Sequence, residues 1–427
     1  MTIGLVKESM DLESRVALVP DDVALIIQKG VEVLVQNSAG TNSGYSNEAY
    51  ESVGAKMDLE SRVALVPDDV ALIIQKGVEV LVQNSAGTNS GYSNEAYESV
   101  GAKIVDTKTA WGQDLVVKCK EPLEHEYPLL KEKATLFSYL DLAYQKSLCE
   151  MFIDKKITSI CTETIAGPKN DYPILVPMSV VAGRLAAHLV QHYLLALEHV
   201  KGFMGKGVML GGLSGAQRAK IVVVGGGVVG MESAKVLSQM GAKVTILELD
   251  YAKLQNHPYY HLYDLEVLSV NEANIIQALN GAVGLVGAVL VTASQTPKVI
   301  LRKHLKYMQK QGVVIDVACD LGGCIETIRQ TSHSNPVYVE EGLLHYGVPN
   351  MPGIAAKTSS VAYSHASVPY LLYYLEHGLK GFLKANTKIV ANTLGGLSAY
   401  NGYITQEGIA KTFNLAFKSP LEVLKEL

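Results

Sequence analysis

A glycine-rich segment near the middle of the chain carries the clearest chemical pattern in the sequence. Gly225, Gly227 and Gly230 have the spacing G-x-G-x-x-G, and Glu248 follows further along the chain. Glycines at these places permit a tight turn, the approach of backbone to a pyrophosphate, and close packing of a helix on a strand. A carboxylate after the second strand accepts hydrogen bonds from ribose hydroxyls and repels a 2′-phosphate. The pattern therefore predicts a site for NAD rather than NADP.

The segments around these glycines match the elements that such a site requires. Residues 219–224 are rich in β-branched side chains, which predicts a strand buried in a parallel sheet. Residues 231–240 have helical periodicity, so the N-terminus of a helix would face the phosphates. Residues 242–247 predict a second strand that ends at Glu248. The glycine motif alone is a weak signal, but with both strands and the helix it predicts a Rossmann-type unit.

Composition argues against several classes of partner. With 427 residues, 48% of them hydrophobic, and a net charge of -5, the chain has no electrostatic reason to bind nucleic acid or an anionic membrane. The apolar stretch 180–197 is interrupted by Arg184 and His188, so it predicts a buried helix rather than a membrane span. Five cysteines without a CxxC pair indicate reduced thiols and a cytoplasmic protein.

One pair of histidines has a spacing that could indicate a metal site. His257 and His261 lie four residues apart, which in a helix would place both rings on one face. Pro258 between them disfavours a regular helix, and no third ligand is evident nearby. We therefore predict no metal site.

A tandem repeat occupies the N-terminal part of the chain. Residues 10–56 recur without a single difference as residues 57–103, so each copy carries one arginine, Arg15 or Arg62. The predicted helices cover 21–29 and 68–76, and the predicted strands cover 31–35 and 78–82. We expect the first copy to dock in the core, because the opening strand then reaches Arg15 through a short tether. The extra copy should protrude, or compete for the same place and loosen the domain.

Several short segments together resemble the alanine dehydrogenase and pyridine nucleotide transhydrogenase family. They are residues 13–18, 117–122, 136–140, 177–179, 181–184, 317–320, 322–324 and 350–353. With one copy of the repeat left out, the resemblance covers nearly the whole chain. It implies reversible, NAD-dependent oxidative deamination of L-alanine to pyruvate and ammonium, usually in a homo-hexamer.

Carried over by position, the resemblance also implies roles for single residues. Arg15 (or Arg62) and Lys120 would bind the substrate, and Asp320 matches the family's catalytic aspartate. The implied cofactor-binding residues are Ser179, Gly225, Gly227, Gly230, Glu248, Lys253, Val289, Leu290, Asn350 and Met351. The residue types suit the substrate roles, because the planar fork of arginine binds a carboxylate through two parallel hydrogen bonds. A lysine in a partly closed site can polarise a carbonyl oxygen.

Asp141 departs from the family pattern at a position that matters for catalysis. The family carries a histidine here as its acid–base group, whereas an ordinary aspartate would be ionised and would repel the substrate carboxylate. Two interpretations remain open. Repulsion between Asp141 and Asp320 could raise one pKa and restore a proton donor, or the protein could bind NAD with impaired or lost catalysis. In either case we expect Asp141→His to raise alanine-dependent NAD reduction.

The predicted architecture is α/β, with two Rossmann-like doubly wound domains. Residues 175–356 would form the NAD-binding domain. Residues 1–174 and 357–427 would form a discontinuous substrate domain that includes both copies of the repeat. A helix over 179–199 and a second over 359–376 should connect the two domains. A third function, that of a transhydrogenase-like subunit, would need a membrane partner that this sequence does not support.

Overall fold

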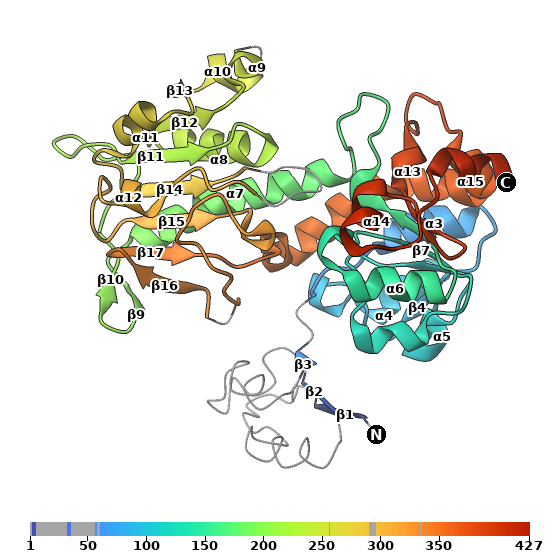
Figure 1. The fold of residues 1–427 in the computed structure, drawn as a ribbon. Coiled ribbons are helices and arrows are strands. Elements are labelled where there is room, and N and C mark those ends of the chain that lie inside the picture. Colours follow the sequence, from blue (N-terminus) through green and yellow to red (C-terminus); the bar gives the residue numbers. More distant parts are fainter. Residues whose placement is uncertain are drawn as a thin grey trace.

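Two lobes joined by long helices make up most of the protein (Figure 1). The computed structural model describes residues 60–427 apart from 256, 290–295 and 334, together with the backbone at 2–5, 32–35 and 56–57. The side chains of Lys253, His261 and Leu321 lie outside the described part. The predicted α/β fold with two Rossmann-like domains is confirmed.

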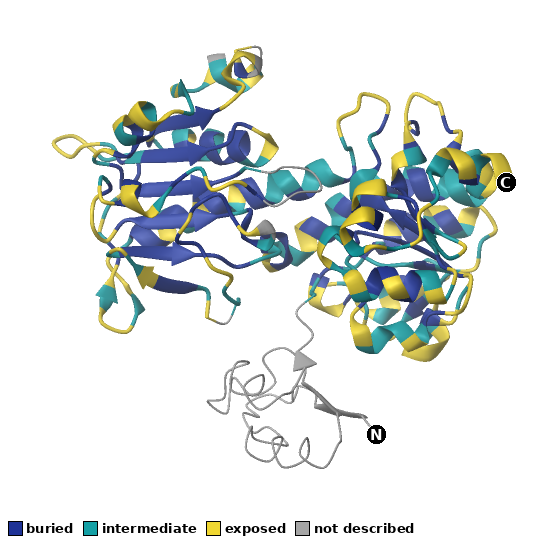
Figure 2. Ribbon diagram, in the orientation of Figure 1, coloured by how far each residue is buried: buried dark blue, intermediate teal, exposed yellow. Residues whose placement is uncertain are grey.

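The first lobe is built on a seven-stranded sheet with the order β13-β12-β11-β14-β15-β17-β16. The strands are β11 (Lys220–Val224), β12 (Lys243–Glu248), β13 (Leu265–Ser269), β14 (Gly284–Gly287), β15 (Val313–Asp316), β16 (Val337–Glu340) and β17 (Leu343–Tyr346). All neighbouring pairs are parallel except β16 and β17. Residues 221–224 are fully buried, as a strand covered by helices on both faces must be (Figure 2). The helices of this lobe are α8 (Val228–Gln239), α9 (Tyr251–Leu254), α10 (Pro258–Leu262), α11 (Glu272–Leu279) and α12 (Arg302–Leu305).

The second lobe combines segments from both ends of the chain. Its five-stranded sheet has the order β19-β18-β8-β7-β6. The strands are β6 (Leu115–Val117), β7 (Thr135–Ser138), β8 (Thr158–Cys161), β18 (Leu397–Tyr400) and β19 (Tyr403–Ile404), with a separate pair β4 (Leu81–Gln83) and β5 (Lys103–Val105). Its helices are α3 (Pro67–Gln75), α4 (Asn94–Glu98), α5 (Thr107–Trp111), α6 (Lys146–Asp154), α14 (Glu407–Phe413) and α15 (Pro420–Glu426).

Two long helices run between the lobes (Figure 1). They are α7 (Leu175–Leu194) and α13 (Ala356–Leu383), and each begins a few residues before the helix predicted from the sequence. Helix α7 packs closely along α8, where a side chain at Gly183 would collide with the backbone of Val229. Among the described helices, none is both long and apolar enough to cross a membrane.

The second copy of the repeat is built into the core, in the place that we predicted for the first copy. Most of the first copy lies outside the described residues. Helix α3 of the second copy lies against α13, where Val63 N–H donates to Ser360 Oγ and Val66 N–H donates to Ser364 Oγ, both at 3.0 Å. The second copy also runs without interruption into β5, which pairs with β4. Covalent continuity with the rest of the lobe is the physical reason for this choice, because it avoids a 47-residue loop inside the sheet. Arg15 lies outside the described residues.

Candidate active site

The glycine loop joins β11 directly to α8, and each predicted glycine has a distinct geometry. Gly225 has a φ of 97°, and a Cβ there would lie 2.6 Å from the carbonyl oxygen of Ala288. A Cβ at Gly230 would lie 1.8 Å from the carbonyl oxygen of Gly225, so only glycine lets the helix pack this closely. A Cβ at Gly227 would meet nothing within 4 Å, which leaves open space beside the helix N-terminus. Helix α8 begins three residues earlier than predicted, immediately after this loop.

Glu248 closes the loop from the end of β12. Its carboxylate is buried and accepts hydrogen bonds from the backbone N–H groups of Gly226 and Asp250. These bonds hold the carboxylate beside the glycines, where a ribose would lie next to a pyrophosphate at the helix N-terminus. The open space at Gly227 and the position of Glu248 therefore fit an NAD molecule.

The other residues predicted to bind the cofactor have mixed environments. Ser179 lies half-buried near the start of α7, and Val289 lies half-buried shortly after β14. Met351 is almost fully buried and packs into the core of the first lobe. Lys253 lies on α9, but its side chain is outside the described part, as is the whole of Leu290.

A cavity of about 1590 Å³ brings the predicted substrate residues together. Arg62, Lys120 and Asp141 line it from the second lobe, and Asp320 and Asn350 line it from the first. These five residues come from distant parts of the sequence, so the tertiary fold alone makes them neighbours. Lys120 and Asp141 follow β6 and β7, whose carboxyl ends meet at the same edge of the sheet.

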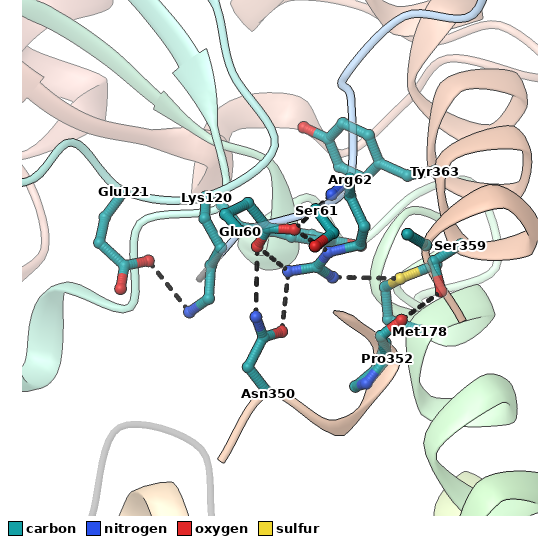
Figure 3. A network of polar contacts seen from close by, with 12 residues as sticks. Glu60, Ser61, Arg62, Lys120, Glu121, Met178, Asn350, Pro352, Ser359 and Tyr363 are labelled. Carbon is teal, nitrogen blue, oxygen red and sulfur yellow. Dashed lines mark hydrogen bonds and ion pairs between the residues drawn. The ribbon is translucent and has the colours of Figure 1, made fainter. Parts of the chain in front are cut away.

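Arg62 is buried, and three side chains hold its guanidinium in place (Figure 3). Its Nε and Nη2 donate to the two carboxylate oxygens of Glu60 at 2.8 and 2.7 Å. Nη2 also donates to Oδ1 of Asn350 at 2.8 Å, and Nη1 lies 3.5 Å from Sδ of Met178. Burial alone would raise the pKa of Glu60, but its bonds to Arg62 hold that pKa below the ordinary value. The guanidinium is thus fixed and charged at the wall of the cavity.

Lys120 forms the second positive charge of the site. Its Nζ lies 3.0 Å from Oε2 of Glu121. Burial alone would lower the pKa of Lys120, but Glu121 and Asp141 outweigh burial and hold it above the ordinary value. The ammonium therefore stays charged at neutral pH, as the predicted role at a carbonyl oxygen requires.

Asp141 has a strongly altered proton affinity. Burial is the main cause, and despite the opposing pull of Lys120 the pKa rises to about 6. The negative charges of Glu163 and Glu121 add to this rise, whereas Asp320, whose repulsion was one of the two interpretations left open by the sequence, has a smaller effect. An aspartate with this pKa titrates close to the range of the histidine that the family pattern has at this position. Asp141 can therefore supply a proton donor near neutral pH.

Glu163 is a contributor that the sequence analysis missed. Its Oε1 accepts hydrogen bonds from the backbone N–H groups of Leu140 at 2.9 Å and Asp141 at 2.8 Å. Asp141 has a φ of 46°, in the left-handed region that non-glycine residues rarely adopt, so these bonds hold an unusual turn. A signal was available, because Glu163 follows β8 and therefore lies at the same sheet edge as Asp141.

Comparisons with known proteins agree along the whole chain. The sequence model of the alanine dehydrogenase/PNT N-terminal domain matches residues 4–59 and again 56–182, and that of the C-terminal domain matches residues 192–407. The alanine dehydrogenase of Bacillus subtilis (strain 168) is 38% identical over 427 residues, covering 100% of this chain and 98% of the relative. Alanine dehydrogenase 2 of Staphylococcus aureus (strain USA300) is 36% identical over 426 residues, covering 100% of both chains.

Solved structures give the same result for the fold. An L-alanine dehydrogenase with 31% sequence identity superposes with a TM-score of 0.70, covering 97% of this chain and 99% of that one. A transhydrogenase from Sinorhizobium meliloti superposes with a TM-score of 0.63 at 17% identity, covering 95% and 99%, and at this identity it supports the fold alone.

The fold and the glycine loop define an NAD-dependent oxidoreductase with two Rossmann-like domains. The double match of the N-terminal domain reflects the repeat and leaves the rest of the comparison unchanged. The chain belongs to the alanine dehydrogenase/PNT family.

Proposed function

We propose that this protein catalyses the reversible, NAD-dependent oxidative deamination of L-alanine to pyruvate and ammonium. One observation carries the proposal: two cations and two carboxyl groups, on Arg62, Lys120, Asp141 and Asp320, line a single cavity together with Asn350 of the NAD-binding lobe. This set suits a small 2-oxo acid, which presents one carboxylate and one carbonyl oxygen. The relatives named alanine dehydrogenase support the choice of substrate.

Arg62 binds the substrate carboxylate and Lys120 binds the carbonyl oxygen. A buried arginine gives short, charge-assisted hydrogen bonds, and its fork fixes the orientation of a carboxylate. Glu60 binds Nε and Nη2 of Arg62 and thereby keeps the side chain in one rotamer. Nη1, whose contact is the sulfur of Met178, is the nitrogen left to bind the substrate carboxylate. The ammonium of Lys120 then polarises the carbonyl of pyruvate for attack by ammonia.

Asp141 exchanges the proton that the reaction requires. In the direction of amination its protonated form donates to the oxygen that leaves the substrate, and in the direction of deamination its ionised form accepts a proton. A pKa of about 6 provides both forms near neutral pH. This value removes the main reason for the alternative of an NAD-binding homologue without catalysis, and the full-length relatives do not favour that alternative either.

The glycine loop and Glu248 hold the cofactor at the carboxyl end of the first sheet. NAD, when bound, accepts the hydride from the α-carbon of alanine. Asp320 lies just after β15, in a short 3-10 helix that lines the same cavity, and it acts as the catalytic aspartate of the first lobe. Ser179, Lys253, Val289, Leu290, Asn350 and Met351 complete the proposed cofactor site.

Each of the two domains binds one of the reactants. Residues 175–356 bind NAD, and residues 1–174 with 357–427 bind the substrate. The chain works as a homo-hexamer in the cytoplasm, as the resemblance to the family implies. Sedimentation analysis tests this assembly, since a hexamer of 46.0 kDa chains is easily separated from a monomer or dimer.

An assay of NADH oxidation with a panel of 2-oxo acids tests the proposed reaction. We expect oxidation with pyruvate only when ammonium is present, and a much lower rate with NADPH because Glu248 repels a 2′-phosphate. Oxidation without ammonium would indicate a 2-hydroxy acid dehydrogenase instead. Tight NADH binding without turnover of any 2-oxo acid would contradict the proposal.

A further inference from the structure

Asp320 reaches the cavity from a loop that has little regular structure of its own. Residues 317–325 follow β15, and Asp320 lies in a single 3-10 turn, Cys319–Leu321. Among the described residues, its carboxylate receives a hydrogen bond only from Sγ of Cys319 at 3.6 Å, and a thiol is a weak donor. Gln330 donates to the backbone carbonyl groups of Cys319 and Asp320 at 3.3 and 3.5 Å, which are long bonds. The position of Asp320 therefore depends on how the rest of the loop is held.

A buried carboxylate holds both ends of this loop. Asp316, the last residue of β15, is fully buried. Its Oδ1 accepts a hydrogen bond from the backbone N–H of Ala318, and its Oδ2 accepts one from the backbone N–H of Ile325, both at 3.0 Å. Asp316 is not among the residues that line the cavity, so any effect on the substrate passes through the loop.

Two consecutive glycines let the loop fold around the carboxylate of Asp316. Gly322 and Gly323 have φ values of 89° and 72°, in the region that favours glycine. A Cβ at Gly323 would lie 2.7 Å from Oδ2 of Asp316, so the backbone itself packs on the carboxylate. On the side of β14, a Cβ at Gly287 would lie 2.8 Å from Cγ of Asp316. The carboxylate is thus packed between the loop and the neighbouring strand.

Lys298 holds the same loop through its carbonyl groups. Its Nζ donates to the carbonyl oxygen of Gly322 and, at 3.2 Å, to that of Ile325. Ile325 is therefore bound at its N–H by Asp316 and at its C=O by Lys298. Burial raises the pKa of Asp316, whereas the N–H donors and the charge of Lys298 oppose this rise. The two opposite charges attract each other across the loop and draw it together.

We propose that Asp316 and Lys298 are positioning residues, which hold the loop 317–325 between them and thereby fix Asp320 at the substrate cavity. This inference rests on the proposed function, in which Asp320 is the catalytic aspartate. A displacement of about 1 Å in a reacting group can lower a rate about 100-fold. Neither Asp316 nor Lys298 lines the cavity, so the pair supports the chemical step and not the binding of pyruvate.

Lys298→Met tests the proposal without a change in the buried core. Methionine donates no hydrogen bond, so it releases two carbonyl groups of the loop, whereas Lys298→Arg keeps the donors. Lys220→Met is the matched control, because Nζ of Lys220 also donates to two carbonyl oxygens in the same lobe. These belong to Gln277 at 2.9 Å and Asn280 at 3.2 Å, at the C-terminal end of α11.

The kinetics separate positioning from binding in the full-length protein. In the NADH oxidation assay with pyruvate and ammonium, Lys298→Met should lower kcat about 10-fold. The KM for pyruvate and the affinity for NADH should change by less than about twofold. Lys298→Arg should restore most of kcat, and Lys220→Met should keep it. An equal loss in Lys220→Met, or an unchanged kcat in Lys298→Met, would overturn the proposal.

A double-mutant cycle shows whether the effect passes through Asp320. Once Asp320→Asn has removed the catalytic carboxylate, Lys298→Met should cause no further loss of the residual rate. Losses that multiply would mean that Lys298 acts by another route, and would overturn the proposal. Asp316→Asn turns an amide donor toward one of its two N–H partners, so kcat should fall at least as far as in Lys298→Met. A retained kcat would remove Asp316 from the pair.

Hydrogen exchange followed by mass spectrometry tests the hold on the loop independently of activity. Lys298→Met should speed exchange in residues 317–325 several-fold, and Lys220→Met should speed it in residues 272–280 instead. Unchanged exchange in 317–325 would overturn the proposal. Absence of NADH oxidation in the unsubstituted protein would contradict the proposed function, and the exchange rates would still decide whether the pair holds the loop. The two failures are therefore distinguishable.

Discussion

The two copies of the repeat have the same 47 residues and occupy different places in the molecule. In the second copy, Arg62 lies buried at the active-site cavity, α3 packs on α13, and β4 borders the substrate lobe. In the first copy, the described strand β2 (Glu32–Val35) pairs with β1 (Thr2–Leu5) and β3 (Lys56–Met57) in a separate three-stranded sheet. Local sequence is identical, so local propensity cannot decide which copy builds the site. The residues that follow each copy decide, because only the second leads directly into the remainder of the lobe.

This difference can be tested by making the same substitution in each copy. Ile73 is 2% exposed and packs in the core of the substrate lobe, and Ile26 is its counterpart. Ile73→Ala should lower the free energy of unfolding by about 3 to 4 kcal/mol, because it leaves a cavity in a packed core. Ile26→Ala should leave it nearly unchanged. Urea denaturation measures both, and equal losses would mean that the copies share the core position.

Asp141 lies outside the repeat, and substitutions there test the proposed active site independently of the two copies. Its pKa of about 6 in the folded protein exceeds the ordinary value of 3.8, so its ionisation opposes folding. The stability that this carboxyl contributes is fully present below pH 4 and is lost as the pH rises through 6. Asp141→Asn should therefore stabilise the protein by about 3 kcal/mol at pH 7 or above, and hardly at all at pH 4.

The same substitution separates stability from catalysis. Asp141→Asn cannot exchange a proton, so the activity that depends on a group titrating near pH 6 should disappear. Asp141→His should retain an ionisation in this range, as its ordinary pKa is about 6.5. A pH profile of NADH oxidation with each variant provides the measurement. An unchanged profile in Asp141→Asn would assign the proton exchange to another residue.

Tyr97 and Tyr50 provide the smallest paired effect. Tyr97 is buried, and its hydroxyl donates to the carbonyl oxygen of Leu65 at 2.9 Å. Tyr97→Phe removes this bond and should lower the free energy of unfolding by about 1 kcal/mol. Tyr50→Phe, the same change in the first copy, should have no measurable effect in the same denaturation experiment. The reverse pattern would contradict the assignment of the second copy to the core.

Much of the NAD-binding lobe was predictable because its signals are local. The spacing of Gly225 and Gly230 encodes a turn and a close contact, and both occur where the sequence placed them. The strands on either side were also predictable, since runs of buried β-branched residues suit a parallel sheet. The start of α8 differed from the prediction, because the helix begins at Val228, directly after Gly227 of the loop.

The substrate site was predictable in its residue types but not in its electrostatics. Arg62, Lys120, Asp141 and Asp320 were all named from the sequence, with Arg15 preferred to Arg62. The pKa of Asp141 could not be predicted, because it depends mainly on burial, which is set by the tertiary structure. Glu163 was missed although its position after β8 was an available signal, and its bonds to the backbone at Leu140 and Asp141 depend on the pairing of β7 with β8.

The kinetics of Arg62→Lys and Arg15→Lys, compared side by side, test the central claim most directly. Lysine keeps the charge but loses the planar guanidinium, whose Nε and Nη2 are held by Glu60 and Asn350 while Nη1 is left for the substrate carboxylate. With pyruvate, ammonium and NADH, Arg62→Lys should lower kcat/KM for pyruvate by about 100-fold, while Arg15→Lys changes it by less than about twofold. NADH affinity, measured by fluorescence, should be unchanged in both variants. A loss of activity in Arg15→Lys with little change in Arg62→Lys would contradict a substrate site built from the second copy.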